Sequence, residues 1–136
     1  MLALTDPIKT RLAALPALDG WAVRTGTELF DRRTAPVADV RCSGAVVADS
    51  RTSAVMVAPE WAIALVVKRG DAAAGQIDVA FAAVVDSQSN WKPGQHGGRG
   101  WEPLKLARVT EPLFDDAGLV GCELVFSTCA RYMGQN

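Results

Sequence analysis

A strictly alternating segment near the end of the chain constrains the fold more than any other feature. Between residues 119 and 132 the side chains divide into two sets, as expected of a strand with one better-buried face. One set contains Val120, Cys122, Leu124, Phe126 and Thr128, and the other contains Gly121, Glu123, Val125 and Ser127. Residues 104–113 can form a first arm, and the Asp-Asp-Ala-Gly sequence at residues 115–118 is typical of a tight turn. The last third of the chain, residues 101–132, is therefore predicted to be a β-hairpin.

Two helices are predicted. Asp6 and Pro7 suit the cap and first turn of a helix that continues to about Leu15, before Pro16. Asp71 is the expected cap of a second helix at residues 71–85. An apolar stripe along that helix faces the sheet and contains Ile77, Phe81, Val84 and Val85.

The first half of the chain is predicted to form three strands. A short strand at residues 21–24 precedes a connection at 25–34 and a long hairpin whose arms extend beyond the compact body. The hairpin comprises residues 35–47, an irregular middle at 49–53, and extended pieces at 54–58 and 61–68. The run from Trp61 to Val67 is the most apolar and is expected to be central in the sheet. Pro59 predicts a break, a bulge or an edge.

The remaining segment, residues 87–103, is expected to be irregular. Its Gly-rich part, residues 91–101, contains four glycines and a proline, a composition unsuited to a helix or a regular central strand. The predicted order is thus α-β-β-β-α-β-β in one domain, residues 1–136. The fold class is α+β, with a mainly antiparallel or mixed sheet, two helices packed on one face, and a long protruding hairpin. A chain of this length buries roughly two-thirds of its unfolded surface.

Composition restricts the possible partners. Fourteen basic and fifteen acidic residues give a net charge of −1, which disfavours binding to nucleic acid or to anionic membranes. No long apolar run or leader pattern is visible, so a soluble, unexported protein is expected. Three cysteines without C-x-x-C spacing fit a reducing cytoplasm. Because 49 % of the residues are hydrophobic, we expect part of the surface to be covered by another subunit.

No residue set predicts catalysis. The Gly-rich segment matches neither phosphate-binding motif and follows a helix instead of preceding one, so it is interpreted as a connecting or contact loop. His96 is the only histidine, and neither metal ligands nor a catalytic serine accompany it at a suitable spacing. Cys122 and Cys129 are interpreted as buried structural thiols that lie on opposite faces of one strand. We predict a protein that is not an enzyme and has no cofactor and no metal.

Two kinds of residue are candidates for contacts with partners or with another subunit. Tryptophans of the Gly-rich segment can pack inward or anchor a partner, and basic residues at element ends can meet acidic surfaces. The candidates are Trp91, Lys92, His96, Arg99, Trp101, Arg51, Lys68 and Arg69.

Taken together, the element order resembles the phage tail terminator, or tail completion, family of contractile-tail and Mu-like phages and prophages. The resemblance covers nearly the whole chain and rests on element order without an invariant motif. It is carried by the helix at 6–15, the strand at 21–24, the hairpin ending in Trp61-Ala62-Ile63-Ala64-Leu65-Val66-Val67, the helix at 71–85, the loop Gly100-Trp101-Glu102-Pro103-Leu104, and the closing Glu123-Leu124-Val125-Phe126-Ser127-Thr128.

The resemblance implies an α+β protein that forms a ring, hexameric in the family, on the head-proximal end of a tail tube. Such a ring ends tube assembly and offers a docking surface to the neck. It implies contacts with further copies of the chain, with tube and possibly sheath protein, and with a neck or connector protein, made by residues 37–68 and 91–101. The expected location is the host cytoplasm during assembly and then the tail of a virion or tail-like particle. Two alternatives stay open: a head–tail connector or neck adaptor, and a small-molecule-binding domain or enzyme that uses His96.

Overall fold

A computed structural model describes residues 2–26, 36–51, 54–111 and 118–133 of the chain, without the side chains of 48–51. Most of the predicted connection at 25–34 and most of the predicted turn at 115–118 lie outside these residues. The short 3₁₀ helices are η1 (Leu2–Leu4) and η2 (Pro16–Leu18), and the α-helices are α1 (Thr5–Ala13) and α2 (Ala73–Gln88). The strands are β1 (Ala22–Thr25), β2 (Val37–Arg51), β3 (Ala54–Lys68), β4 (Gly94–His96), β5 (Arg99–Trp101), β6 (Lys105–Thr110), β7 (Leu119–Ser127) and β8 (Ala130–Met133).

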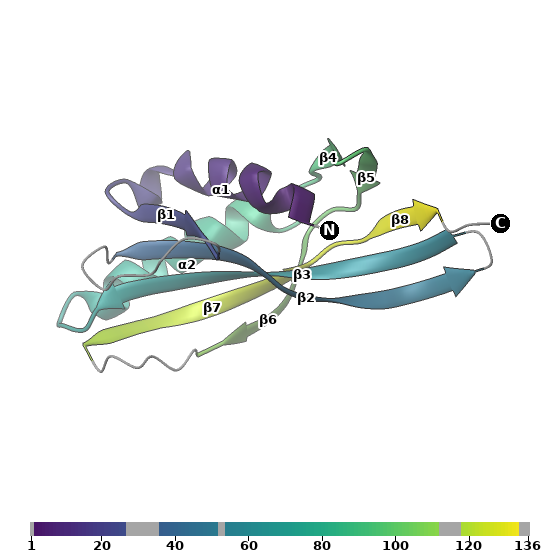
Figure 1. Cartoon of the computed structure of the whole chain (residues 1–136). Coiled ribbons are helices and arrows are strands. Elements are labelled where there is room, and N and C mark those ends of the chain that lie inside the picture. Colours follow the sequence, from purple (N-terminus) through teal and green to yellow (C-terminus); the bar gives the residue numbers. More distant parts are fainter. Residues whose placement is uncertain (1, 27–35, 52–53, 112–117, 134–136) are drawn as a thin grey trace.

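Six strands form the main sheet in the order β1-β2-β3-β7-β6, and β8 pairs with β3 beyond the end of β7. Only β1 and β2 are parallel, and the other neighbours are antiparallel. Both α-helices lie on the same face of this sheet (Figure 1). The predicted α+β class, the mixed sheet and the order of the predicted elements are confirmed, with β4, β5 and a separate β8 as additions.

The predicted long hairpin is formed by β2 and β3, each of 15 residues. The half of β3 from Glu60 to Lys68 pairs with β7 in the body, and the half from Ala54 to Val57 pairs with β8. The outer halves of β2 and β3, together with β8, extend away from the helices (Figure 1). We call this projection, residues 44–51, 54–58 and 130–133, the arm.

Pro59 marks the junction of body and arm. Of the break, bulge or edge predicted at Pro59, the break is absent, because β3 continues through this residue. Strand β2 continues to Arg51, so residues 49–51, predicted to be irregular, belong to a strand, with a register shift between Val47 and Asp49. The irregularity instead lies in the neighbours, because β7 ends and β8 begins beside Pro59 and β2 has a register shift between Cys42 and Gly44. The Pro59 carbonyl accepts a hydrogen bond from the Thr128 N–H at 3.4 Å. The missing N–H of Pro59 therefore faces the gap between β7 and β8, where no ladder bond is lost.

The core lies between the sheet and the two helices. Trp61, Ile63 and Leu65 of β3 and Leu124 and Phe126 of β7 are fully buried on the helix side. The predicted difference between the two faces of β7 is not observed, because Gly121, Glu123 and Val125 on the other face are buried as well. Burial along α2 is centred differently from the predicted stripe: Val84 is fully buried, whereas Ile77, Phe81 and Val85 are only partly buried. The buried residues of α2 are Ala73, Ala80, Val84 and Gln88. Small alanines at the contact let the helix approach the sheet closely.

Neither predicted aspartate cap is present. Helix α1 follows η1 directly, so Asp6 is already the second residue of the helix, and Leu4 at the cap position has helical dihedral angles. Helix α2 is preceded by Ala72, also in a helical conformation and without a side-chain cap. A capping side chain needs an extended backbone at the cap position, and the preceding helical turns remove that conformation.

The sheet face opposite to α1 and α2, called here the far face, carries two ion pairs that each cross one strand. Arg41 of β2 reaches over β3 to Glu123 of β7 at 2.8 Å, and Ala62 and Ala64 of β3 leave room for it. Arg108 of β6 reaches over β7 to Glu60 of β3 with two hydrogen bonds of 2.8 and 3.1 Å. The pairs therefore link β2, β3, β7 and β6 side to side.

The Arg108–Glu60 pair makes stability depend on pH. The hydrogen bonds from Arg108 lower the pKa of the Glu60 carboxyl below its ordinary value. The stabilisation is present above the ordinary carboxyl range and is lost as the pH falls through the lowered pKa. We expect the difference in unfolding free energy between wild type and Glu60→Gln, measured with urea from about pH 7 to about pH 3, to shrink on acidification. A difference that stays constant with pH would contradict this assignment. High salt is expected to reduce the difference, because both side chains are partly exposed.

Candidate interaction surface

The Gly-rich segment is ordered as a small hairpin and is not irregular as predicted. Strands β4 and β5 pair with each other and are separate from the main sheet. Gly97 and Gly98 connect them with φ angles of +62° and +76°. Two consecutive residues with positive φ are the requirement of the type I′ hairpin turn, which glycine meets without steric cost. The glycines that argued against a central strand therefore permit an isolated hairpin.

Two of the predicted contact residues hold this hairpin in place. Trp101 is 3 % exposed and belongs to the main core, and its Nε1–H donates to the carbonyl of His96 at 3.0 Å. His96 Nε2 donates to the carbonyl of Pro93 at 2.9 Å. Trp101 thus packs inward, the first of the two roles considered for it, and its indole is not offered to a partner. His96 remains partly exposed, with one ring nitrogen used within its own loop.

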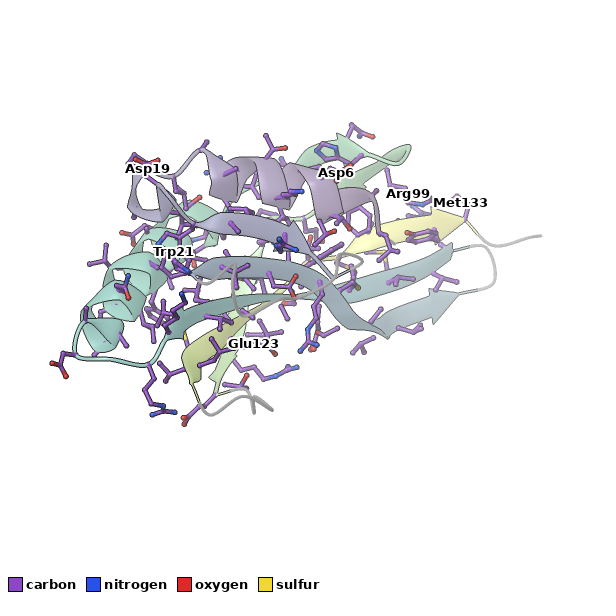
Figure 2. All side chains as sticks on the ribbon, turned by 60° about the vertical axis from the view of Figure 1, so that its left-hand side comes forward. Asp6, Asp19, Trp21, Arg99, Glu123 and Met133 are labelled. Carbon is purple, nitrogen blue, oxygen red and sulfur yellow. The ribbon has the colours of Figure 1, made fainter. Side chains whose placement is uncertain are left out.

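Arg99 connects the hairpin to the arm. Its guanidinium carbon lies 3.8 Å from the centroid of the Tyr132 ring on β8, and Nη1 donates to the carbonyl of Gly97 at 3.0 Å. Figure 2 shows Arg99 beside β8, near Met133. A backbone hydrogen bond from Glu102 N–H to the carbonyl of Cys129 adds a second connection at 3.0 Å. The hairpin therefore braces the base of the arm.

An open, largely apolar groove lies between α1, the end of α2 and the β4–β5 hairpin. Trp91 forms one wall, and the Arg11 guanidinium lies over its ring at 4.8 Å from the centroid. Arg11 Nε also donates to the carbonyl of Ser87 at 3.0 Å. The groove is lined by Asp6, Pro7, Thr10, Arg11, Ala14, Leu15, Ser87, Trp91 and His96. Two predicted contact residues, Trp91 and His96, thus meet at one concave surface.

We expect Arg11→Lys to destabilise the protein by about 1 kcal/mol, because lysine keeps the charge but loses the Nε hydrogen bond and the planar contact with Trp91. Chemical denaturation monitored by tryptophan fluorescence measures the change. Arg131→Lys, at an exposed position of β8, is the control and is expected to stay within about 0.5 kcal/mol of wild type. Equal effects of the two substitutions would show that the Arg11 contacts do not stabilise the junction.

The eight predicted contact residues do not form one cluster. Lys92 is exposed next to the groove wall, whereas Lys68 and Arg69 are exposed at the β3–α2 connection, at the opposite end of the molecule from β8 (Figure 1). Arg51 ends β2 at the tip of the arm, and its side chain lies outside the described residues. A partner that contacts all eight would have to span the whole molecule, so any single interface includes only some of them.

The strongest surface feature lies inside the expected contact region 37–68, at residues that the sequence interpretation did not single out. Ala45, Val46 and Val47 are consecutive exposed apolar residues on β2 of the arm, with 58 % of Val46 and 62 % of Val47 accessible. Met133 on β8 is 69 % exposed at the other side of the arm. Runs of exposed apolar residues are unfavourable on a surface that stays in water. The pattern therefore indicates an interface on the arm.

The cysteines are only partly buried, so the prediction of buried thiols for Cys122 and Cys129 is not confirmed. All three are free. Burial, and secondarily the Asp78 carboxylate, raises the pKa of the Cys122 thiol, and burial with Glu102 raises that of Cys129. The two do not share one strand as predicted, because Cys129 lies in the break between β7 and β8. Among the described residues, no group of three or more His, Cys, Asp or Glu side chains is placed to hold a metal ion. None of the helices in the described ranges is long and apolar enough to cross a membrane.

Comparisons with known proteins bear on the fold. No protein-family profile matches the chain, and no curated protein matches its sequence. Among solved structures, a chain in the structure of the virion of a native gene transfer agent (GTA) particle is similar, with a TM-score of 0.71. The match covers 96 % of this chain and 96 % of that chain at 21 % sequence identity. The two proteins therefore share one fold over nearly their whole lengths.

Proposed function

We propose that this protein is a structural subunit of a phage-like particle. The observation that carries the proposal is the shared fold, because nearly all of this chain superimposes on nearly all of a chain from a virion. A fold by itself hosts many functions. A second feature also supports the proposal. The projecting arm with its exposed valines suits a protein that works by assembling with others.

Within such a particle, the proposed role is that of a tail terminator. Copies of the chain form a ring on the head-proximal end of the tail tube, hexameric as in the resembling family, which ends tube and sheath assembly and receives the neck. A ring requires a head-to-tail contact in which two different patches of the same chain meet. The arm and the groove are different patches that could serve in such contacts. The protein does this work by binding, without chemistry.

Electron microscopy of purified protein, alone and mixed with tail tubes from the same particle, tests the role. The expected result is rings that cap one end of each tube and stop further tube growth when tube subunits are added. Rings that bind heads or isolated neck protein but leave both tube ends free would instead identify a connector. A protein that stays monomeric at every concentration and binds neither tubes nor heads would refute the structural role.

A further inference from the structure

We propose that neighbouring copies join by β-sheet extension, in which β6 of one copy pairs antiparallel with the arm section of β2 in the next. Two surfaces take part: the section Gly44–Val47 of β2 and the section Leu106–Val109 of β6. The inference rests on the proposed function only in requiring that copies of the chain assemble. Its occupant is a second copy of this chain.

In the part of the chain that the structure describes, the two sections lie on opposite edges of one sheet and pair with no further strand. Strand β1 covers β2 only from Val37 to Val40, and no strand of the described chain pairs with the outer side of β2 beyond that point. Strand β6 ends the sheet on the other side and pairs only with β7 among the described strands. Open strand edges present unpaired N–H and C=O groups that a further strand can satisfy. Opposite edges are what a head-to-tail contact requires.

Apolar side chains are exposed at both edges. On β2 these are Ala45, Val46 and Val47, and on β6 they are Leu106 and Val109, which are 37 % and 48 % exposed. All six residues of β6 are exposed, in contrast to the mostly buried β7 beside it. Proteins normally protect open edges with charge or cover them. Strand β6 does carry Lys105 and Arg108, but the side chains on the helix side of both edges are apolar residues that a neighbouring strand would bury.

The direction of the backbone groups agrees at the two edges. The Pro59 carbonyl and the Thr128 N–H face each other, so the backbone groups of Pro59 point toward β7 and β8, and those of Thr128 point toward β3. Every second residue repeats these directions, so the backbone groups of Val57 point toward β8 and those of Phe126 point toward β3. In an antiparallel ladder, residues opposite such positions on the next strand turn their groups outward. These outward residues are Ala45 and Val47 on β2 and Leu106 and Val109 on β6.

This agreement fixes how two copies can join. The partners of Ala45, Val47, Leu106 and Val109 in β3 and β7 are on the helix side of the sheet, so these side chains are on that side too. When outward residues of the two edges pair, the helices of both copies lie on the same face of the extended sheet. Strand β6 runs opposite to β7 and therefore opposite to β2, which makes the joint antiparallel.

The joint is short and staggered. Register shifts on either side of Gly44–Val47 and between Leu106 and Arg108 limit regular pairing to a few residues. Val47 pairs with Val57 of β3. Leu106 and Val109 pair with residues of β7 that in turn pair with Trp61 and Ile63 of β3. Pairing Val47 of one copy with Leu106 or Val109 of the next therefore displaces neighbouring copies along the strand direction by about four to six residues. Closed sheets have a stagger of this kind. A short joint is expected to be weak between two copies and stronger in a closed ring.

Cysteine cross-linking tests the joint. Val47→Cys on a copy with a large tag is mixed with untagged Val109→Cys and oxidised mildly, with and without tail tubes. Opposed residues in a ladder are close enough for a disulfide, so a product with the mass of one copy of each is expected only in the mixture. A second mixture, Ala45→Cys with Val109→Cys, detects a register shifted by two residues. Wild type and Val79→Cys, an equally exposed position at 60 % on α2, measure background from the native thiols.

The outcomes separate this inference from the proposed function. Mixed products at least five-fold above the Val79→Cys background support the joint. Products of Val47→Cys with itself would show a symmetric β2–β2 contact and overturn it, as would no product from either mixture in samples whose rings are visible on tubes. Rings on tubes without mixed products leave the proposed function intact and remove only the joint. Mixed products from a protein that never caps tubes keep the joint and remove the terminator role.

Discussion

The Gly121→Ala variant is expected to lose about 3 kcal/mol of unfolding free energy. Gly121 is buried in β7 directly opposite Val66 of β3. A Cβ atom there would overlap the carbonyl oxygen of Leu65 and lie 3.1 Å from the Cα of Val66. Both are backbone atoms of the central strand, so the clash cannot be relieved by a side-chain rotation. Relief requires β3 and β7 to move apart along the core ladder.

Gly75→Ala provides a matched control with the opposite sign. Gly75 lies in α2 and a Cβ there would meet no atom within 4 Å. Alanine is the better helix former, so this variant is expected to gain roughly 0.5 kcal/mol. Urea denaturation at one pH and temperature compares both with wild type. A Gly121→Ala variant as stable as wild type would mean that the β3–β7 spacing adjusts freely, and the close approach would have no energetic role.

The side-chain alternation that identified β7 placed Leu124 and Phe126 on one face correctly, although it did not predict that Gly121, Glu123 and Val125 on the other face are also buried. Leu124 and Phe126 are fully buried under the helices, and Trp61 is buried opposite Phe126 in the central strand. These assignments succeeded because a one-residue slip in a strand exchanges its two faces, so the apolar pattern specifies the register strongly. The two helices and their places in the element order were predicted in the same way, from apolar residues that recur at helical spacing.

Features that depend on neighbouring strands could not be derived from local pattern. The break between β7 and β8 falls inside a segment that alternates without interruption in sequence, and it lies beside Pro59 of the adjacent strand. The parallel pairing of β1 with β2 depends on a long connection and leaves no local signal. The hairpin at Gly97 and Gly98 had a signal, since two adjacent glycines favour a type I′ turn, but its flanks are too short to show alternation.

The candidate surface was predictable only in part. Trp91 and His96 do meet at a groove, yet the groove depends on Arg11 from a helix 76 positions away from Ser87 in sequence. Trp101 was correctly recognised as a residue that could pack inward, and only the structure shows that it does. The extension of the long hairpin beyond the body was predicted, but the valines of the arm looked like ordinary strand residues, because the sequence does not reveal which residues of the hairpin lie past the helices. Exposure of Val46 and Val47 is a property of the topology.

Ring assembly is expected to depend on Val46 and Val47 far more than the unfolding free energy of the single chain does. Val47→Asp places a charge where the helix side of the arm would be buried by a neighbouring copy, and burial of an unpaired charge is strongly unfavourable. We expect this variant to lose ring formation and tube capping, with at least a ten-fold weaker association measured by analytical ultracentrifugation. Its unfolding free energy is expected to change by no more than about 1 kcal/mol, because the residue is 62 % exposed in the isolated chain.

Val79→Asp is the matched control, since Val79 is 60 % exposed but lies on the outer surface of α2, away from both open sheet edges. It introduces the same charge from the same residue type and is expected to leave capping unchanged. Val46→Asp separates the two faces of the arm, because the partner of Val46 in β3, Ala58, is on the far face and Val47 is on the helix side. Joining by sheet extension predicts a smaller loss of capping for Val46→Asp than for Val47→Asp. The reason is that the helices of both copies lie on the face of the extended sheet that carries Val47, whereas Val46 is on the far face. If Val79→Asp abolishes capping while Val47→Asp does not, the interface lies on the helices, and the arm has another role.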